Sequence, residues 1–456
     1  MTVTVTYVRA RGRLFFALCA EKYFVLSYGI RRRRDPVIDV ILNINSALVL
    51  LFCALSAYQY LYILVSILFP ARRFTAENDK RFAVLICARN EEAVIAQLID
   101  SIHQQTYPAD LIDIFVLADN CTDRTEEIAR SCGAHTYVRQ NTQKIGKGYA
   151  LDFLFRALRE EYGDTYYDGY FVFDADNLLA PDYIEQMNTV FSNGFRVVTG
   201  YRNSKNLGKN WITAGYGVMF LREARHMNNA RMILHTSSNI SGTGFLVHRD
   251  IINANDGWPY HTLTEDLEFT MDRVAEGERI GYCHDAVFYD EQPTSFLQSW
   301  HQRIRWSKGF LQAALKRGGK VLRGMFRPKS AFPCFDEVMS TLPTLLLSVF
   351  ATVSIISMVV AVFAGRFGFL HFLSAFGAYL LGIYAVNFFL GLLTVITEWK
   401  KIHCAAWKKI LYTFTFPIFM ITNIPITIAS LFCRSRWKQI AHSDSKTIAE
   451  LQNEES

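Results

Sequence analysis

The chain has 456 residues, a net charge of +6, 51% hydrophobic residues and 20% charged residues. This length leaves room for more than one domain, and the composition indicates segments that lie in a membrane. The modest charge comes without a recognisable nucleic-acid-binding module, which argues against nucleic acid as a partner. The nine cysteines show no Cys-x-x-Cys spacing, which argues against a zinc site or a disulfide framework and fits a reducing compartment.

Residues 1–35 are basic and aromatic, include the run Arg31–Arg34, and are expected to form an interfacial helix or a poorly ordered segment. They lack the long apolar core and the cleavage site of a signal peptide. Residues 36–71 are predicted to form the first transmembrane helix. Its core, Ala47–Phe69, meets the requirement of about 20 mainly apolar residues for a spanning helix.

Residues 78–300 are predicted to form a soluble α/β domain. Short apolar runs alternate with amphipathic stretches in its first half, which is typical of a doubly wound parallel sheet with helical crossovers. The predicted strands are Phe82–Ile86, Ile112–Ala118, Ala134–Arg139 and Tyr170–Asp176. Beyond residue 181 the pattern is mixed α/β, and the turns between the elements are less regularly spaced. The fold class is therefore α/β and Rossmann-like.

The C-terminal third returns to apolar sequence. Residues 301–335 are expected to form basic amphipathic helices in the membrane interface, with a solvent-exposed surface helix as the alternative. Residues 340–433 contain three further predicted spans: Leu342–Ala364, Phe369–Thr397 and Ile410–Phe432. Pro417 and Pro425 predict a kink or a break in the last of them. Residues 434–456 form a polar tail.

Asp174 and Asp176 stand at the end of a predicted buried strand, with only Ala175 between them. Ligands of α/β folds bind at this carboxyl edge of the sheet. Successive side chains of a strand point to opposite faces, so the pair can share one cation only if the chain already turns, as Asn177 suggests. Two carboxylates completed by substrate phosphates are typical of Mg²⁺ or Mn²⁺. The alternative is a helix cap followed by a turn residue.

The ordered motifs of residues 80–310 resemble the membrane-integrated, inverting family 2 glycosyltransferases, which include the processive cellulose, chitin and hyaluronan synthases. The matching stretches are Ala88-Arg-Asn-Glu-Glu92, Ala118-Asp-Asn-Cys-Thr-Asp123, Gly146-Lys-Gly148, Asp174-Ala-Asp176, Thr264-Glu-Asp266 and Gln302-Arg-Ile-Arg-Trp306. The resemblance implies a GT-A-type domain in the cytoplasm, with transmembrane helices on both sides of it in the sequence. The expected location is the cell (plasma) membrane.

The resemblance implies a UDP-sugar donor. The residues implied to bind it are Ala88, Arg89, Asn90, Glu91, Asp119, Lys147, Asp174, Ala175, Asp176 and Arg305. A divalent ion on Asp174 and Asp176 would neutralise the diphosphate, and Asp119 would face the uracil. Lys147 would add a point charge, although a solvated loop lysine is the alternative. The first-loop residues are alternatively ordinary capping residues.

The resemblance assigns inverting transfer to Asp266 as the general base, with Thr264 and Glu265 before it. Thr264–Glu268 is also typical of a helix start, where backbone donors would lower the pKa of Asp266 and keep it ionised. The implied catalytic set is Glu265, Asp266, Gln302, Arg305 and Trp306.

Gln302, Arg305 and Trp306 fall at helical spacing and therefore share one face. Arg305 can bind a diphosphate bidentately, and Trp306 offers a flat surface on which a sugar ring stacks. The family position implies that the acceptor approaches Ser241, Gly242, Thr243, Gly244 and Trp306. A plain turn is the alternative for the small-residue loop. We also expect Trp258 and His261 to shape the acceptor pocket, although a lone histidine is more often structural.

The sequence thus predicts a multi-pass, metal-dependent hexosyltransferase. Its expected partners are a UDP-sugar, a polysaccharide or lipid acceptor, and membrane lipids. The leading reading is processive transfer of glucose or N-acetylglucosamine to a growing β-linked polysaccharide, coupled to membrane translocation. The alternative is a single-transfer glycolipid synthase with a diacylglycerol or polyprenol acceptor. Because the chemistry-bearing residues are all present, a non-catalytic scaffold is disfavoured.

Overall fold

A computed structural model describes residues 36–76, 78–365, 368–433 and 442–453. The chain divides into two compact units, one of Met1–Leu48 with Val353–Gly377 and one of Val49–Thr352 with Ala378–Ser456. The described part of the first unit is helical. The second unit holds the sheet and all the predicted site residues. The expected basic segment at residues 1–35 lies outside the described residues.

An eight-stranded mixed sheet has the strand order β3-β2-β1-β4-β7-β6-β8-β5. The strands are β1 (Phe82–Ala88), β2 (Ile112–Asp119), β3 (His135–Arg139), β4 (Gly169–Asp174), β5 (Leu178–Leu179), β6 (Val197–Ser204), β7 (Phe245–His248) and β8 (Ile280–Asp290). The pairs β1–β2, β1–β4 and β2–β3 are parallel, as the sequence predicts. Strand β7 runs antiparallel to β4 and β6, which makes the second half mixed.

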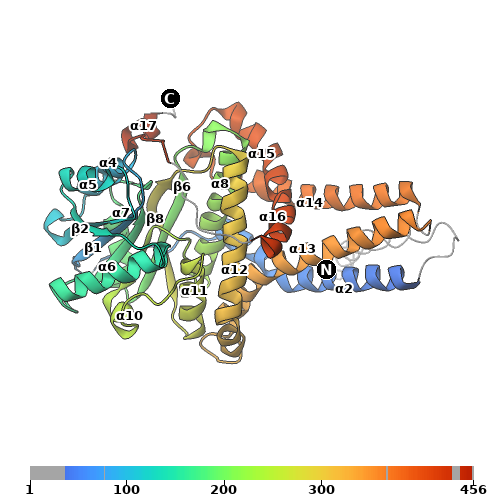
Figure 1. Cartoon of the computed structure of the whole chain (residues 1–456), viewed down its shortest axis with the longest axis horizontal. Coiled ribbons are helices and arrows are strands. Elements are labelled where there is room, and N and C mark those ends of the chain that lie inside the picture. Colours follow the sequence, from blue (N-terminus) through green and yellow to red (C-terminus); the bar gives the residue numbers. More distant parts are fainter. Residues whose placement is uncertain (1–35, 77, 366–367, 434–441, 454–456) are drawn as a thin grey trace, which may run out of the picture. The chain divides into compact units, whose positions relative to one another are not determined.

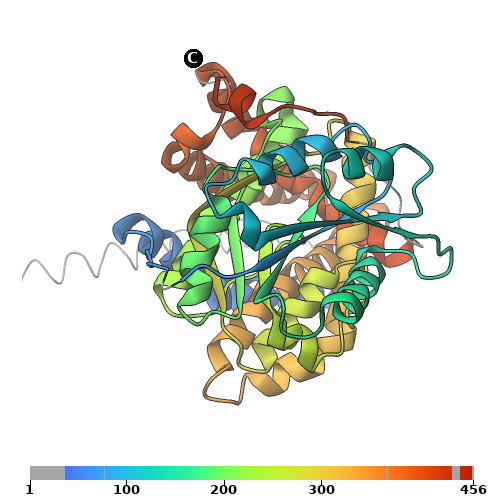
Figure 2. The same ribbon diagram turned by 90° about the vertical axis from the view of Figure 1, so that its left-hand side faces the viewer.

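Helices cover both faces of this sheet (Figures 1 and 2). The helices of the domain are α4 (Ile95–His103), α5 (Thr125–Ser131), α6 (Lys147–Tyr162), α7 (Tyr183–Ser192), α8 (Trp211–Arg222), η3 (Glu223–Asn228, a π-helical turn), α9 (Asn229–Ile233), α10 (Arg249–Ala254), α11 (Glu265–Ala275) and α12 (Phe296–Gly324). Short 3-10 turns lie at Ala109–Leu111 and Leu207–Lys209.

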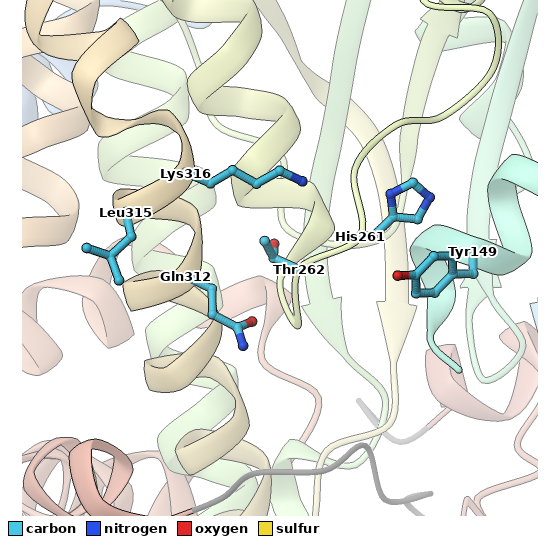
Figure 3. Close-up of a pocket in the computed structure, with 6 residues that line it drawn as sticks. All are labelled: Tyr149, His261, Thr262, Gln312, Leu315 and Lys316. Atoms are coloured by element: carbon cyan, nitrogen blue, oxygen red, sulfur yellow. The ribbon is translucent and has the colours of Figure 1, made fainter. Parts of the chain in front are cut away.

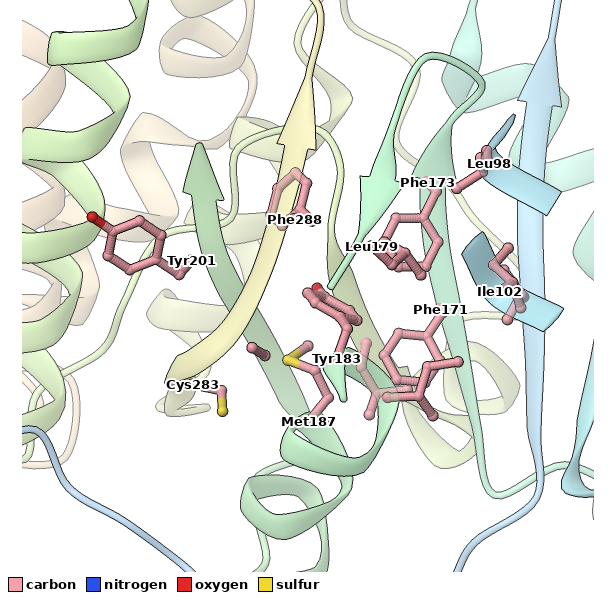
Figure 4. Close-up of a cluster of buried hydrophobic side chains, with 14 of the residues drawn as sticks. Leu98, Ile102, Phe171, Phe173, Leu179, Tyr183, Met187, Tyr201, Cys283 and Phe288 are labelled. Carbon is pink, nitrogen blue, oxygen red and sulfur yellow. The ribbon is translucent and has the colours of Figure 1, made fainter. Parts of the chain in front are cut away.

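The alternation of side chains along β1 divides the core in two. Phe82, Val84 and Ile86 pack with apolar residues of α4, α5, α7 and α8, whereas Ala83 and Leu85 pack with those of α6, α10 and α11. Figure 4 shows the first cluster, in which aromatic rings of β4 meet side chains from α4 and α7. Both faces of the parallel strands are covered, which explains why these strands are almost continuously apolar.

Among the described residues, four helical stretches are long and apolar enough to cross a membrane: Ser46–Leu68, Ala331–Phe363, Phe372–Thr397 and Ala406–Phe432. They belong to α2 (Pro36–Ser56) with α3 (Tyr58–Leu68), α13 (Ala331–Phe363), α14 (Phe369–Thr397), and α15 (Ala406–Ile421) with α16 (Asn423–Phe432). A 3-10 turn at Trp399–Lys401 follows α14, and a short helix α17 (Ile448–Asn453) lies in the tail. These stretches indicate association with a membrane.

The last of these stretches is broken, as its prolines predict. Helix α15 ends at Ile421 and α16 begins at Asn423. Pro425 has no N–H to donate to the carbonyl of Ile421, so the regular ladder cannot continue there. Arg303 of α12 binds the break, because its Nη1 donates to the Thr422 Oγ1 at 2.8 Å and to the Phe419 carbonyl at 3.2 Å.

Helix α12 packs along α11. Arg317 Nη2 lies 3.1 Å from Glu268 Oε1, and Lys320 Nζ lies 2.6 Å from Asp272 Oδ1. Lys316 Nζ also pairs with Glu268 at 2.7 Å. Three basic residues that suggested a helix in the membrane interface are therefore bound to carboxylates of the α/β domain, and they hold α12 against α11.

Candidate active site

The chain turns directly after β4 and presents two carboxylates. The N–H of Asn177 donates to the carbonyl of Asp174 at 3.1 Å, so Asp174 and Asp176 are not held in strand alternation. The side chain of Asp174 is 42% exposed, whereas Asp176 is buried and its Oδ2 accepts the N–H of Glu291 at 2.8 Å. Ala175 between them is buried in the core. The turn that the sequence required is present.

These two carboxylates fit a cation shared with a diphosphate. Among the described residues, no group of three or more His, Cys, Asp or Glu side chains is placed to hold a metal ion. A pair of carboxylates completed by phosphate oxygens is the ordinary site for Mg²⁺ or Mn²⁺. Burial opposes ionisation of Asp176, but the nearby charges of His442 and Lys205 outweigh it and lower the pKa. Asp176 is therefore an anionic carboxylate at neutral pH.

Lys147 lies between the carboxylate of Asp174 and the loop Ser241–Gly244. Its Nζ pairs with Asp174 and donates to the carbonyl of Gly242 at 2.7 Å. Burial lowers the pKa of Lys147, but the Asp174 and Glu265 carboxylates raise it by more, so the side chain is cationic. Lys147 is thus an ion-paired residue of the site rather than a solvated loop lysine.

The glycines beside Lys147 have separate structural reasons. Gly146 has φ +133°, a conformation that side chains rarely adopt, and it lets the loop turn into α6. A Cβ on Gly148 would lie 2.0 Å from the carbonyl oxygen of Tyr260. Only glycine therefore lets the first turn of α6 approach the loop before α11 so closely.

The loop Ser241–Gly244 lies next to both Asp174 and Asp266. The backbone N–H of Asp174 donates to the Thr243 Oγ1 at 2.9 Å, and the Thr243 hydroxyl donates in turn to Asn177 Oδ1. Gly242 has φ +80°, and a Cβ there would lie 3.5 Å from Asp266 Oδ2. A stretch of backbone without large side chains therefore lies between Asp174 and the predicted base, Asp266.

Glu265 and Asp266 occupy the first turn of α11, after Thr264. The side chain of Thr264 makes no cap, and its hydroxyl is buried without a hydrogen-bond partner among the described residues. Burial and the neighbouring Asp266 charge raise the pKa of Glu265 to about 7, and burial raises the pKa of Asp266 as well. The expectation that the helix start lowers the pKa of Asp266 is wrong, because desolvation outweighs the backbone donor.

The predicted face of Gln302, Arg305 and Trp306 lies on α12. Arg305 Nη1 donates to the carbonyl of Leu263 at 3.2 Å, and the Oε1 of Gln302 is buried without a partner among the described residues. Arg305 also favours the charged forms of Glu265 and Asp266. This part of α12 therefore lies close to the start of α11.

Trp306 is held by α8. Its ring meets Tyr216 edge-on with centroids 5.7 Å apart and Phe220 at 6.3 Å. The tryptophan is half-buried, so part of its ring remains accessible. Aromatic packing therefore fixes the orientation of the surface predicted to stack on a sugar ring.

The first two β–α loops form the other side of the candidate site. Ala88 ends β1, and Asn90 follows with φ +55°, its Oδ1 accepting the N–H of Thr122 at 2.7 Å. Asp119 is buried and its Oδ1 lies 2.5 Å from Arg139 Nη1. Arg89 contributes to stabilising the charged form of Asp119. The loops are brought together, but Asp119 already has a cationic partner.

Two groups, Arg202 and His442, were missed by the sequence analysis. Arg202 of β6 pairs with Asp290, donates to the carbonyl of Ser241 at 2.8 Å, and stacks on Phe220 with its guanidinium 3.7 Å from the ring centroid. His442 binds Glu91, with Nδ1 2.9 Å from Oε2. Neither of them belongs to a spaced motif, so only tertiary structure could place them.

Trp258 does not shape an acceptor pocket. It is fully buried and stacks on Phe269 with centroids 4.7 Å apart, so that expectation is wrong. His261 stacks near Tyr149 at 4.2 Å, and both line a shallow pocket of about 560 Å³ with Thr262, Gln312, Leu315 and Lys316 (Figure 3). Apart from His261, the pocket's lining contains none of the predicted site residues.

Comparison with known proteins agrees with the sequence motifs. Residues 80–309 match the family described as "Glycosyltransferase like family 2". The chain is 28% identical over 233 residues to beta-monoglucosyldiacylglycerol synthase of Synechocystis sp., covering 51% of this chain and 48% of that protein. It is 27% identical over 253 residues to the probable glycosyltransferase YdaM of Bacillus subtilis, covering 54% and 59%. The match thus spans about half the length of these curated relatives.

A solved structure shares the fold. The mannosyltransferase PcManGT from Pyrobaculum calidifontis, in complex with GDP-Man and Mn²⁺, aligns with a TM-score of 0.56 at 16% identity. The alignment covers 84% of this chain and 98% of that one. The likeness confirms the α/β fold of GT-A type with long apolar helices beside it.

Proposed function

We propose, because the chain belongs to glycosyltransferase family 2, that it transfers a hexose from a UDP-sugar to a hydroxyl group of a membrane lipid. Glucose is the first candidate sugar and diacylglycerol the first candidate acceptor. The catalytic domain faces the cytosol in this proposal, and the product is a glycolipid made by a single transfer.

The named relatives support the lipid acceptor over the polysaccharide. Two curated relatives, of Synechocystis and of Nostoc, are named beta-monoglucosyldiacylglycerol synthases. The family description that residues 80–309 match names no product, so it does not discriminate between the two products. We therefore favour the glycolipid synthase, which the sequence analysis held as the alternative.

One observation carries the proposal: the loop Ser241–Gly244 connects a donor side to a base. Lys147 binds both Asp174 and the carbonyl of Gly242, and a Cβ on Gly242 would lie 3.5 Å from Asp266 Oδ2. A sugar whose diphosphate lies at Asp174 would then place its anomeric carbon near Asp266. This arrangement suits an attack from the face opposite the leaving group.

In the proposed reaction, the acceptor hydroxyl transfers its proton to the carboxylate of Asp266. The freed oxygen forms a bond to the anomeric carbon, and the bond from that carbon to the diphosphate oxygen breaks, which inverts the configuration and leaves UDP. A raised pKa makes Asp266 a stronger base than an ordinary carboxylate, provided that it is ionised at the working pH.

The leaving diphosphate must be stabilised as its charge develops. Arg305 and Lys147 would bind it directly, one as a planar guanidinium and the other as a point charge. Asp174 and Asp176 would hold a divalent ion, which when bound supplies electrostatic stabilisation of the leaving group. Trp306 would support the acceptor.

The test is transfer by the purified full-length protein in detergent. UDP-glucose, UDP-N-acetylglucosamine, UDP-galactose and GDP-mannose are each incubated with Mn²⁺ and with diacylglycerol, a polyprenyl phosphate or no acceptor. We expect UDP release that depends on diacylglycerol, and a single organic-extractable product whose mass equals diacylglycerol plus one hexose. A polymer smear on an acrylamide gel would instead support the polysaccharide synthase. Absence of transfer from every donor would contradict the proposal.

A further inference from the structure

A short stretch of the tail, His442–Asp444, lies against the carboxyl edge of the sheet. Three of its groups are anchored there. His442 Nδ1 lies 2.9 Å from Glu91 Oε2. The N–H groups of Ser443 and Asp444 donate to Glu291 Oε2 at 3.0 and 2.9 Å. Glu91 follows β1 and Glu291 follows β8, so the tail connects the ends of two strands at this edge of the sheet.

The anchors satisfy charges that are buried in the domain. Lys205 is 3% exposed, and its Nζ donates to the carbonyl of Asp444 at 2.8 Å. Glu291 is 8% exposed, and its carboxylate accepts the two tail N–H groups. If the tail left, both a buried ammonium and a buried carboxylate would lose hydrogen bonds, which is unfavourable in a low-dielectric interior. The tail is therefore a fixed part of the domain rather than a cover that opens easily.

The anchors also lie beside the predicted donor-binding groups. Glu91 belongs to the first donor loop, and the backbone N–H of Glu291 donates to Asp176 at 2.8 Å. Burial lowers the pKa of His442, but the carboxylates of Asp176, Glu91 and Glu291 outweigh it and raise the pKa to about 10. The histidine is therefore cationic at neutral pH and favours the ionised form of both donor-side carboxylates.

We propose that His442–Asp444 forms a wall of the nucleotide-sugar site and that His442 is a positioning residue, which orients Glu91 for the donor. The proposal rests on the function proposed above, since it requires a nucleotide-sugar at this edge of the sheet. Glu91 is the group that meets the ribose or base, and His442 acts on the donor through it. In the described part of the chain, the hydrogen bonds of this wall go to Glu91, Glu291 and Lys205, and none goes to Asp266 or Trp306 on the acceptor side.

The first experiment compares three variants of the full-length protein. His442→Ala removes the bond to Glu91. His442→Asn retains it, because an asparagine amide nitrogen takes nearly the place of Nδ1. His103→Ala is the matched control, since His103 is exposed and its Nε2 contacts only the carbonyl of Cys132, at 2.9 Å, among the described residues. UDP affinity is measured by calorimetry with Mn²⁺, and KM is measured for the UDP-sugar and for the acceptor separately.

We expect His442→Ala to weaken UDP binding and to raise the donor KM about tenfold, which is the usual effect of losing one hydrogen bond to a charged group. The acceptor KM should stay within error of the wild type. His442→Asn should recover most of the affinity, and His103→Ala should match the wild type. A merely structural role would change both KM values together.

A second variant tests the wall without touching the histidine. Ser443→Pro removes one N–H that donates to Glu291, and we expect it to weaken UDP binding severalfold as well. Unchanged or tighter UDP binding in both His442→Ala and Ser443→Pro would overturn the proposal, and tighter binding would show that the tail competes with the donor. If the wild type itself binds no UDP, the proposed function fails first; if it binds UDP and the variants equal it, only this inference fails.

Discussion

Gly148→Ala tests whether the close approach of α6 to the loop before α11 builds the donor site. The added Cβ would lie 2.0 Å from the Tyr260 carbonyl oxygen and 3.2 Å from the Cα of His261. Ordinary van der Waals contact begins near 3.4 Å. The two backbones must therefore separate by more than an ångström, and no side-chain rotation can relieve the contact.

The magnitude follows from two opposing effects. Overpacking of a core contact costs about 1–3 kcal/mol, and a contact between backbones belongs at the upper end of that range. Alanine in a helix regains at most about 1 kcal/mol over glycine. We therefore expect a net loss of about 1–2 kcal/mol, which lowers the melting temperature of a domain of this size by several degrees. Because the displaced helix start also carries Lys147, the affinity for UDP should fall as well.

Gly319→Ala is the matched control. Gly319 also lies within a helix, and a Cβ there would meet no atom within 4 Å. The same substitution should therefore raise stability by about 0.5–1 kcal/mol and leave UDP binding unchanged. Thermal unfolding and UDP calorimetry in detergent measure both effects. If Gly148→Ala unfolded at or above the wild-type temperature with unchanged UDP affinity, the argument from backbone contact would be refuted.

Three further outcomes follow from the candidate site. Asp266→Asn should lower the transfer rate by about 10²–10⁴-fold with unchanged UDP affinity, and an unchanged rate would remove Asp266 as the base. The transfer rate should fall as the pH drops through about 7. The pKa of Glu265 is raised to about 7, so the buried pair Glu265–Asp266 takes up a proton there, and this proton blocks the base. A loss of activity that begins only near pH 4.5 would contradict this. Chelation with EDTA should abolish transfer, and added Mn²⁺ should restore it. The Asp176→Asn variant should bind UDP weakly with or without Mn²⁺. Full activity after chelation would argue against a metal on Asp174 and Asp176.

Local sequence was sufficient for the elements that depend on neighbours in the chain. The four parallel strands were predicted because a strand covered on both faces is apolar throughout. The break between α15 and α16 was predicted from proline chemistry. The three residues of α12 were placed on one face by spacing alone. Each of these inferences depends on residues within a few positions of one another.

Electrostatic and long-range features could not be predicted in that way. The pKa of Asp266 was expected to be low, since the helix start is visible in sequence but desolvation is not. Trp258 was assigned to a pocket, although it belongs to the core between β7 and α11. Lys316, Arg317 and Lys320 of α12 were assigned to a lipid surface, whereas their partners are carboxylates of α11.

The sequence by itself determined the α/β order and the apolar spans and nominated Asp174 and Asp176, because hydrophobic periodicity and motif spacing are properties of short stretches of chain. Only the tertiary structure placed Lys147 between Asp174 and the Gly242 carbonyl, and His442 against Glu91. Those contacts join residues that are 95 and 351 positions apart. Such pairs form because the fold brings loop ends to one edge of the sheet, and no local pattern records that they meet.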